Sequence, residues 1–305
     1  MDINVCLATD DNYTKYCATT ISSVVKNKAD DDNLKFYVLY SNLSDENKEK
    51  LKKIADIEFC FVNDDDLLPY FKNTKVIKSV ATYYRIKLPS LLNLDRVIYL
   101  DCDIIVRSSL KSFYEKDFEN NYLAAAEDIS PKGSLRRLNL DENGFYFNAG
   151  SILLNLKKMR EDNIEQQLLQ TLSQADEPYL FADQDVLNIT LFGKVQQIEN
   201  IYNYIPLSAY QSNKDSLDCQ DEPIVLHFAG SKPWEIGFKS AWKDEFWNHF
   251  YSAVGIIPEE EYIKSHRKYC FSKTKLYQLF LYLKLYPFPF SKYKFTQFCK
   301  ILFDF

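Results

Sequence analysis

Glycine is scarce in this sequence: only seven occur among 305 residues. No two of them stand at the spacing of G-x-G-x-x-G or of G-x-x-x-x-G-K-[ST], which excludes a glycine-fingerprint dinucleotide site and a P-loop. A G-x-S-x-G nucleophile elbow is also missing, which argues against a typical α/β-hydrolase. The first two classes of nucleotide-binding site are therefore excluded, and a typical α/β-hydrolase is not expected.

The seven cysteines form no recognisable framework. Their number is odd, their spacing is irregular and no C-x-x-C occurs. A structural zinc site and a disulfide scaffold are therefore not expected, and a reducing cytoplasm is the expected compartment. The first residues have no basic stretch followed by an apolar run, and no stretch of 18 apolar residues exists. The sequence thus predicts neither a signal peptide nor a membrane-spanning helix.

Charge is unevenly distributed along the chain. The whole sequence carries −6, whereas residues 262–305 hold nine Lys/Arg and one acid and so carry +8. Residues 1–261 therefore carry −14. A basic end on an acidic body indicates an anionic binding partner for that end. Nothing in the pattern points to nucleic acid.

Short apolar runs alternate with helical patterns in the first part of the chain. Ser44 reads as the N-cap of one helix because acids follow it. We expect strands at 3–8, 34–40 and 57–62, with helices at 14–27 and 44–55. This β-α-β-α-β order predicts an α/β domain with a mostly parallel sheet.

The same reading extends through the rest of the chain, with Asp183 as the expected cap of one helix. We expect helices at 79–92, 162–174 and 183–192, and strands at 96–100, 122–126, 151–156 and 224–228. Composition changes after Glu259-Glu260-Glu261. The prediction is one α/β domain over residues 1–255 and a helical tail over residues 256–305.

Asp101-Cys102-Asp103 directly follows the apolar strand at 96–100. Ligands of α/β sheets bind outside the carboxyl ends of the strands. Side chains at i and i+2 of an extended chain point the same way, so the two carboxylates would repel each other without a cation between them. This spacing indicates a divalent metal site, and the alternative is a pair of acids that cap a loop.

His227 ends the expected strand at 224–228 and precedes Gly230 and Lys232. At a strand end it can join the same edge as the two aspartates, or it is an ordinary half-buried histidine. Two carboxylates and one imidazole suit Mn²⁺ better than Mg²⁺, which prefers oxygen ligands. Gly230 would allow close backbone approach to a ligand, and Lys232 would offer a positive charge to a phosphate.

Three further polar residues each have a possible structural role and a possible functional role. Asn148, just before the strand at 151–156, serves a turn or a ligand. Asp183 is a helix cap or a sugar ligand. Arg85 is a surface residue or a partner of a carboxylate.

Seven segments taken together resemble glycosyltransferase family 8, which includes bacterial lipopolysaccharide galactosyl- and glucosyltransferases and, more distantly, glycogenin. They are collinear with the family from residue 3 to about residue 242. The segments are ATDDNY at 8–13, ATYYRIKL at 81–88, RVIYLDCDIIV at 96–106, AAEDI at 125–129, YFNAGSILLNLKKMR at 146–160, ADQDVLN at 182–188 and HFAGSKPW at 227–234.

The resemblance implies a GT-A fold, a UDP-glucose or UDP-galactose donor, Mn²⁺ with Mg²⁺ as a weaker substitute, and retention of anomeric configuration. The acceptor it implies is a glycan or glycolipid such as lipopolysaccharide core. The implied metal ligands are Asp101, Asp103 and His227. The implied nucleotide contacts are Ala8, Asp10, Asn12, Tyr13, Asp101, Cys102, Gly230 and Lys232. The implied donor-sugar contacts are Arg85, Asp128, Asn148, Ala149, Asp183 and Gln184. The implied catalytic group is Gln184, Asp183 and Lys232.

Two positions depart from the family pattern. The loop between Gly230 and Pro233-Trp234 is one residue short, so Lys232 would reach the phosphate from a shifted position. Ile77-Lys78 stands where close relatives often carry a basic residue or a histidine.

The chemistry of the implied residues favours front-face transfer. Gln184 is an amide and a poor nucleophile, so leaving UDP would help to deprotonate the acceptor while the Gln184 carbonyl oxygen steadies a cationic sugar. Alternatives are a sugar-nucleotide hydrolase, a nucleotidyltransferase, and an inactive sugar-nucleotide-binding partner in a glycan assembly complex. The acidic ATDDNY argues against the nucleotidyltransferase.

Residues 262–305 combine fourteen aromatics with the nine Lys/Arg. Apolar residues recur at helical spacing with basic residues opposite, which is typical of an interfacial helix. We expect a cytoplasmic enzyme held peripherally on the inner face of the cytoplasmic membrane by this tail. The alternatives are a tail that packs on the acidic body and a tail that forms a homodimer.

Overall fold

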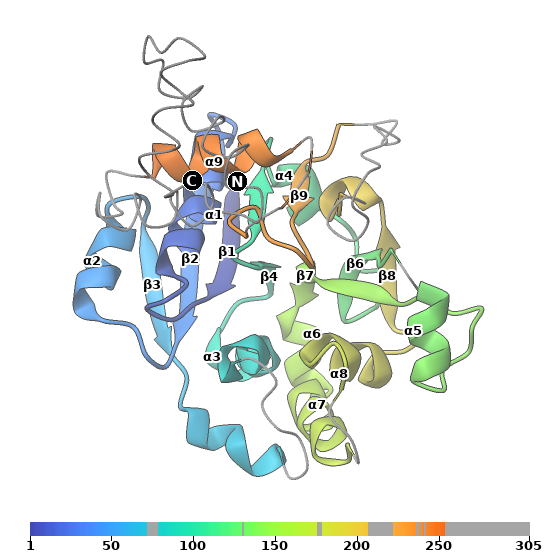
Figure 1. Cartoon of the computed structure of the whole chain (residues 1–305). Helices are drawn as coiled ribbons and strands as arrows, with labels where there is room; N and C mark the ends of the chain where they lie inside the picture. Colours follow the sequence, from blue (N-terminus) through green and yellow to red (C-terminus); the bar gives the residue numbers. More distant parts are fainter. Residues whose placement is uncertain are drawn as a thin grey trace, which may run out of the picture.

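A mixed seven-stranded sheet forms the centre of the computed structural model (Figure 1). The structure describes residues 1–71, 79–129, 131–175, 179–206, 222–235, 238, 240 and 242–253. The strand order is β3-β2-β1-β4-β7-β6-β8, and β7 pairs antiparallel with both of its neighbours while the other pairs are parallel. The strands are β1 (Asp2–Ala8), β2 (Asn33–Tyr40), β3 (Ile57–Phe61), β4 (Arg96–Leu100), β6 (Leu123–Glu127), β7 (Phe147–Asn155) and β8 (Val195–Ile198). The mostly parallel α/β sheet predicted from the sequence is confirmed.

A second, two-stranded sheet and the helices complete the described fold. β5 (Ile104–Val106) pairs antiparallel with β9 (Val225–His227). The α-helices are α1 (Thr14–Lys26), α2 (Asp45–Lys52), α3 (Leu88–Leu91), α4 (Lys111–Tyr114), α5 (Pro131–Arg137), α6 (Leu156–Glu161), α7 (Ile164–Ser173), α8 (Asp183–Thr190) and α9 (Lys243–Ser252). The 3₁₀ helices are η1 (Asp64–Asp66), η2 (Leu68–Tyr70), η3 (Val80–Lys87) and η4 (Asn200–Tyr202).

Successive side chains of a strand point to opposite faces of the sheet, and here both faces are buried. Ile3, Val5 and Leu7 of β1 pack on one side in a cluster with α1, α9, β5 and β9. Cys6 faces the other side, where the cluster includes η3, α3, α6, α7 and α8. The result is a sheet between two helical layers, with α1 and α9 in contact on one side and α7 and α8 in contact on the other (Figure 1).

The helix expected at 79–92 is a 3₁₀ helix over Val80–Lys87 followed by the short α3. Leu88 N–H donates to the Arg85 carbonyl, an i→i−3 bond. An α-helix continuing through this point would need a donor at position 89, and Pro89 has no N–H. The segment is therefore helical as expected, but most of it is a 3₁₀ helix.

Two other boundaries differ from the sequence-based expectation. The N-cap of α8 is Ala182 (φ 50°), and Asp183 is the first helical residue with its carboxylate turned to Arg85. β7 begins at Phe147, four residues earlier than expected, so Asn148 and Gly150 lie in a buried strand rather than in a turn.

Strand directions place the ends of β1, β4 and β9 beside the beginning of β7. Because β7 runs antiparallel to β4, Ser151 stands opposite Leu100 and the preceding residues of β7 face Asp101. His227 pairs with Ile104, directly after Asp103. This edge of the sheet therefore gathers polar residues from four distant parts of the chain.

Among the described residues, no helix has the length and apolarity needed to cross a bilayer. The basic tail predicted over 256–305 lies outside the described residues, as does Ile77-Lys78. The domain boundary at residue 255 stays a prediction.

Candidate active site

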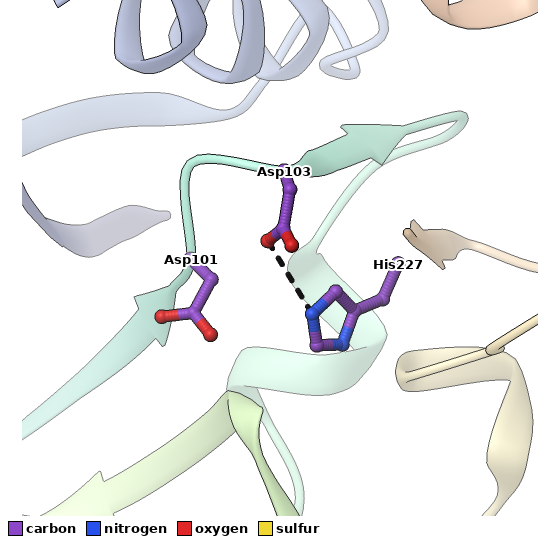
Figure 2. Close-up of side chains that lie close together, drawn as sticks. All are labelled: Asp101, Asp103 and His227. Atoms are coloured by element: carbon purple, nitrogen blue, oxygen red, sulfur yellow. Dashed lines mark ion pairs between the residues drawn. The ribbon is translucent and has the colours of Figure 1, made fainter. Parts of the chain in front are cut away.

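Asp101, Asp103 and His227 come together at the edge of the sheet, as the strand ends predicted. Each offers one ligand atom, and these atoms lie within 4.8 Å of one another. Figure 2 shows the three side chains close together, and a dashed line joins Asp103 to the His227 ring. The distance from His227 Nε2 to Asp103 Oδ1 is 3.4 Å. Asp103 and His227 are buried, while the Asp101 side chain is 29% exposed. Two carboxylates and one imidazole at this spacing can hold a divalent cation.

Gly150 forms the floor beneath these ligands. A side-chain carbon at this position would lie 2.8 Å from Asp101 Oδ2 and 2.9 Å from His227 Nδ1. The Gly150 carbonyl also accepts a hydrogen bond from Asp101 N–H at 2.8 Å. The two ligands reach their positions because residue 150 has no side chain. The donor set and this close packing both fit a bound divalent cation.

Lys232 contacts the same carboxylate that His227 approaches. Its ammonium meets Asp103 Oδ2 and donates to the Phe228 carbonyl at 3.1 Å. Burial by itself would raise the pKa of Asp103, but Lys232 and His227 outweigh burial and hold that pKa below its usual range. Lys232 therefore reaches Asp103 in spite of its short loop. Gly230 enters this loop with φ +81°, a conformation that favours glycine.

Arg85 is a buried partner of two carboxylates rather than a surface residue. Its Nη2 donates to Asp101 Oδ1 at 2.7 Å, and its Nε lies 2.8 Å from Asp183 Oδ2. The second pair is an ion pair without an aligned hydrogen bond, since neither atom has a hydrogen-bond partner. Burial raises the pKa of Asp183 to about 7, with Asp101 adding to the rise and Arg85 opposing it.

This pKa predicts a pH-dependent effect of Asp183→Asn. The folded protein binds this proton more tightly than the unfolded chain, so the stability that protonated Asp183 contributes is present below about pH 4 and lost as pH rises through 7. Asn imitates the protonated form. We expect Asp183→Asn to raise the melting temperature relative to wild type more at pH 8 than at pH 5. The corresponding difference in the free energy of unfolding between these two pH values has an upper bound of roughly 3 kcal/mol, since only about two pH units separate pH 5 from the pKa. A lower melting temperature for the variant at pH 8 would contradict this reading of Asp183.

The Gln184 side chain is held in one orientation by both ends of its amide. Its Oε1 accepts from Ala149 N–H at 3.1 Å. Its Nε2 lies 3.2 Å from Asp128 Oδ2 and 3.1 Å from the Tyr146 hydroxyl. Asp128 also accepts from Asn148 Nδ2 at 3.0 Å. Four of the six donor-sugar residues expected from the sequence, Asp128, Asn148, Ala149 and Gln184, thus form one hydrogen-bonded group.

Asp185 is the next acid on α8. Both of its carboxylate oxygens accept hydrogen bonds, and the residue has no exposed surface. Arg137 binds it with two hydrogen bonds of 2.8 Å. The Tyr146 hydroxyl donates to it at 2.6 Å and Phe181 N–H donates at 3.0 Å. Asp185 therefore supports the start of α8 rather than presenting a free carboxylate.

The segment expected to grip the nucleotide lies next to the metal ligands. The Cys102 thiol donates to the Ala8 carbonyl at 3.2 Å, which joins the end of β1 to the aspartate loop. Asp10 Oδ1 accepts from Tyr13 N–H at 2.9 Å. Asn12 and Tyr13 are exposed at this edge. The residues implied for the nucleotide therefore lie at the end of β1 and in the loops that follow β1, β4 and β9.

Sequence reasoning missed three residues of this region. Gly150 and Tyr146 stand inside a recognised segment without an assigned role, and Asn203 lies outside every segment. Asn203 is buried and its Oδ1 lies 2.9 Å from His227 Nδ1. A lone polar residue in the apolar stretch IYNYI is the one signal for it in the sequence.

The profile of glycosyl transferase family 8 matches residues 4–236. A Haemophilus influenzae protein provisionally named a glycosyltransferase is 33% identical over 243 residues, which is 76% of this chain and 73% of that protein. The lipopolysaccharide 1,2-glucosyltransferase of Escherichia coli K12 is 29% identical over 252 residues, covering 76% of this chain and 72% of the relative.

A solved structure supports the same assignment. The crystal structure of an active-site mutant of LgtC superposes with a TM-score of 0.73 at 27% identity, covering 85% of this chain and 98% of LgtC. LgtC in complex with donor and acceptor sugar analogues, described as a galactosyltransferase, gives a TM-score of 0.69. The fold is therefore of the GT-A type, and the chain belongs to glycosyltransferase family 8.

Proposed function

We propose that this glycosyltransferase transfers glucose or galactose from a UDP-sugar to a glycan or glycolipid such as lipopolysaccharide core, with Mn²⁺ and with retention of configuration. The observation that carries the proposal is the cluster of Asp101, Asp103 and His227 beside the ordered Gln184 amide. The relatives support it, since one is named a lipopolysaccharide glucosyltransferase and another was solved with donor and acceptor sugar analogues.

Asp101, Asp103 and His227 would hold the Mn²⁺. When bound, this ion supplies positive charge that stabilises the diphosphate as it leaves. Lys232 adds a second positive charge from the loop after β9. Its ammonium already stands against Asp103, so it can stay within reach of a phosphate that binds there. Gly230 leaves room for the diphosphate beside the backbone.

The donor sugar would bind between Asp128, Asn148 and Asp183. Asp128 contacts both Gln184 and Asn148, and Asp183 precedes Gln184 at the start of α8. Their carboxylate and amide groups can read the C4 hydroxyl that distinguishes glucose from galactose. Arg85 fixes Asp183 and Asp101 relative to each other, so the sugar side and the cation side of the site keep a constant geometry.

Front-face transfer suits these residues better than a covalent intermediate. Arg137, Tyr146 and Phe181 N–H occupy the oxygens of Asp185, which is therefore a poor nucleophile. Gln184 is an uncharged amide whose carbonyl oxygen lies beside Ala149 N–H. That oxygen would stabilise an oxocarbenium-like sugar, and leaving UDP would accept the proton of the acceptor hydroxyl.

A donor screen by UDP release tests this function. We expect release from UDP-glucose or UDP-galactose in the presence of Mn²⁺, and much less from UDP-N-acetylglucosamine. The alternative is a catalytically weak or inactive partner protein of a glycan assembly complex. UDP binding with no release from any donor, with or without candidate acceptors, would favour that alternative.

We also propose that residues 262–305 hold the enzyme on the inner face of the cytoplasmic membrane. The support is the sequence pattern of nine Lys/Arg among fourteen aromatics. Each basic residue near an anionic surface contributes about 1 kcal/mol. Full-length protein should sediment with anionic liposomes at low salt and less at high salt, whereas a chain ending at Glu261 should stay in the supernatant. Equal behaviour of the two chains would refute this role and favour packing on the body or a homodimer.

A further inference from the structure

A buried chain of hydrogen bonds connects His227 to the donor-sugar residues. His227 Nδ1 lies 2.9 Å from Asn203 Oδ1. Asn203 Nδ2 lies 3.0 Å from Asn148 Oδ1 and 3.3 Å from the Asn148 carbonyl oxygen. Asn148 Nδ2 donates to Asp128 Oδ2 at 3.0 Å. Asn203 and Asn148 are 3% and 5% exposed, so bulk water competes little for these bonds.

The direction of every hydrogen bond in this chain follows from the carboxylate of Asp128 at one end. A carboxylate such as Asp128 accepts, so the nitrogen of the Asn148 amide must face it. The other end of that amide is then an oxygen, in agreement with the 3.0 Å bond that Gly150 N–H donates to it. Asn148 Oδ1 in turn requires the NH₂ group of Asn203 on its side. The oxygen of Asn203 is therefore left to face the imidazole.

This direction decides which nitrogen of His227 carries the proton. An amide oxygen at 2.9 Å accepts a hydrogen bond, so Nδ1 must be the protonated nitrogen. The lone pair of the neutral ring then resides on Nε2, the atom that faces Asp103 at 3.4 Å. A nitrogen with a free lone pair is what a metal ligand needs.

We propose that Asn203 is the positioning residue of His227. It fixes the Nδ1–H tautomer and the plane of the ring, and it takes its own orientation from Asn148 and Asp128 in the donor-sugar pocket. The inference rests on the proposed metal site. Hydrogen-bond partners of metal-bound histidines have this role in other proteins, and their loss commonly costs about 10- to 100-fold in metal affinity.

The test combines a metal-binding measurement with a direct view of the tautomer, using the full chain. Mn²⁺ binding without nucleotide is measured by electron paramagnetic resonance for wild type, Asn203→Leu and Asn203→Asp. We expect about 10- to 100-fold weaker binding for Asn203→Leu. We expect Asn203→Asp to weaken binding less than Asn203→Leu does, because its carboxylate still accepts from Nδ1–H although it no longer donates to Asn148 Oδ1.

The sequence contains only three histidines, so ¹⁵N-histidine NMR can be assigned by removing each one. Wild-type protein without metal should show His227 protonated at Nδ1, and Asn203→Leu should shift it toward the Nε2–H tautomer. Asn27→Leu is the matched control, since Asn27 also donates two hydrogen bonds from its amide, to Ser23 and Val106, away from the site. It should leave both the tautomer and Mn²⁺ affinity unchanged.

An Nε2–H tautomer in wild type would overturn the inference. An Asn203→Leu variant that binds Mn²⁺ as tightly as wild type would also overturn it. An equal loss of Mn²⁺ affinity in Asn27→Leu would mean that the effect is general destabilisation. A further outcome is that wild type binds no Mn²⁺ while His227 still shows the Nδ1–H tautomer. That result would contradict the proposed metal site but would leave Asn203 as the residue that sets the tautomer.

Discussion

Asp103→Ala and His227→Ala are each expected to abolish Mn²⁺-dependent UDP binding and to lower turnover by about 10²-fold or more. Each substitution removes one of three ligand atoms that lie within 4.8 Å of one another. Asp103→Ala also leaves the Lys232 ammonium without its carboxylate. Isothermal titration of UDP with and without Mn²⁺ measures the effect, and circular dichroism checks that the fold persists.

His249→Ala is the matched control for His227→Ala. Both histidines are buried, at 6% and 3% exposure, but His249 lies on α9, away from the ligand cluster. It should keep Mn²⁺-dependent UDP binding even where its own loss lowers the melting temperature. Full activity of His227→Ala in the presence of a chelator would overturn the metal assignment.

Gly150→Ala is expected to weaken Mn²⁺ binding nearly as much as the loss of a ligand does, although it adds only a methyl group. The added carbon would overlap the His227 ring and lie 2.8 Å from Asp101 Oδ2. Buried sites relieve such overlap by displacing side chains, and here the side chains are the proposed ligands. We expect weaker Mn²⁺ binding by electron paramagnetic resonance and a lower melting temperature.

Gly144→Ala separates these two effects. A carbon at Gly144 would overlap the Phe192 ring and lie 2.9 Å from the Asp141 carbonyl oxygen, away from the metal ligands. This variant should also melt at a lower temperature but bind Mn²⁺ as wild type does. Equal loss of metal binding in both variants would mean that Gly150 acts through stability alone.

The sequence predicted the residues that stand at strand ends. Asp101 and Asp103 follow β4, and His227 ends β9, so the rule that ligands bind at the carboxyl edge of a sheet predicts that these three residues meet. The α/β class was also predicted correctly, because apolar periodicity distinguishes strands from helices in the sequence. The resemblance to family 8 added Gln184 and the donor pocket, which no spacing rule supplied.

The sequence did not predict what depends on close approach in space. Asn203 touches His227 and Asn148 across 24 and 55 residues of chain, and the residues around Asn203 reveal neither contact. The need for glycine at position 150 comes from a histidine 77 positions away. The 3₁₀ geometry of Val80–Lys87 was not predicted either, and Pro89, which has no N–H, accounts only for the break between this helix and α3.

The most direct test of retaining, metal-dependent transfer uses water as the acceptor. Full-length protein is incubated with the donor that releases UDP and with Mn²⁺, quenched with EDTA and read at once by proton NMR. UDP-hexoses are α-linked, so retention predicts that the free sugar appears first as its α anomer, and that Asp103→Ala forms none. A sugar that appears first as the β anomer, or equal release without a divalent metal, would contradict the account.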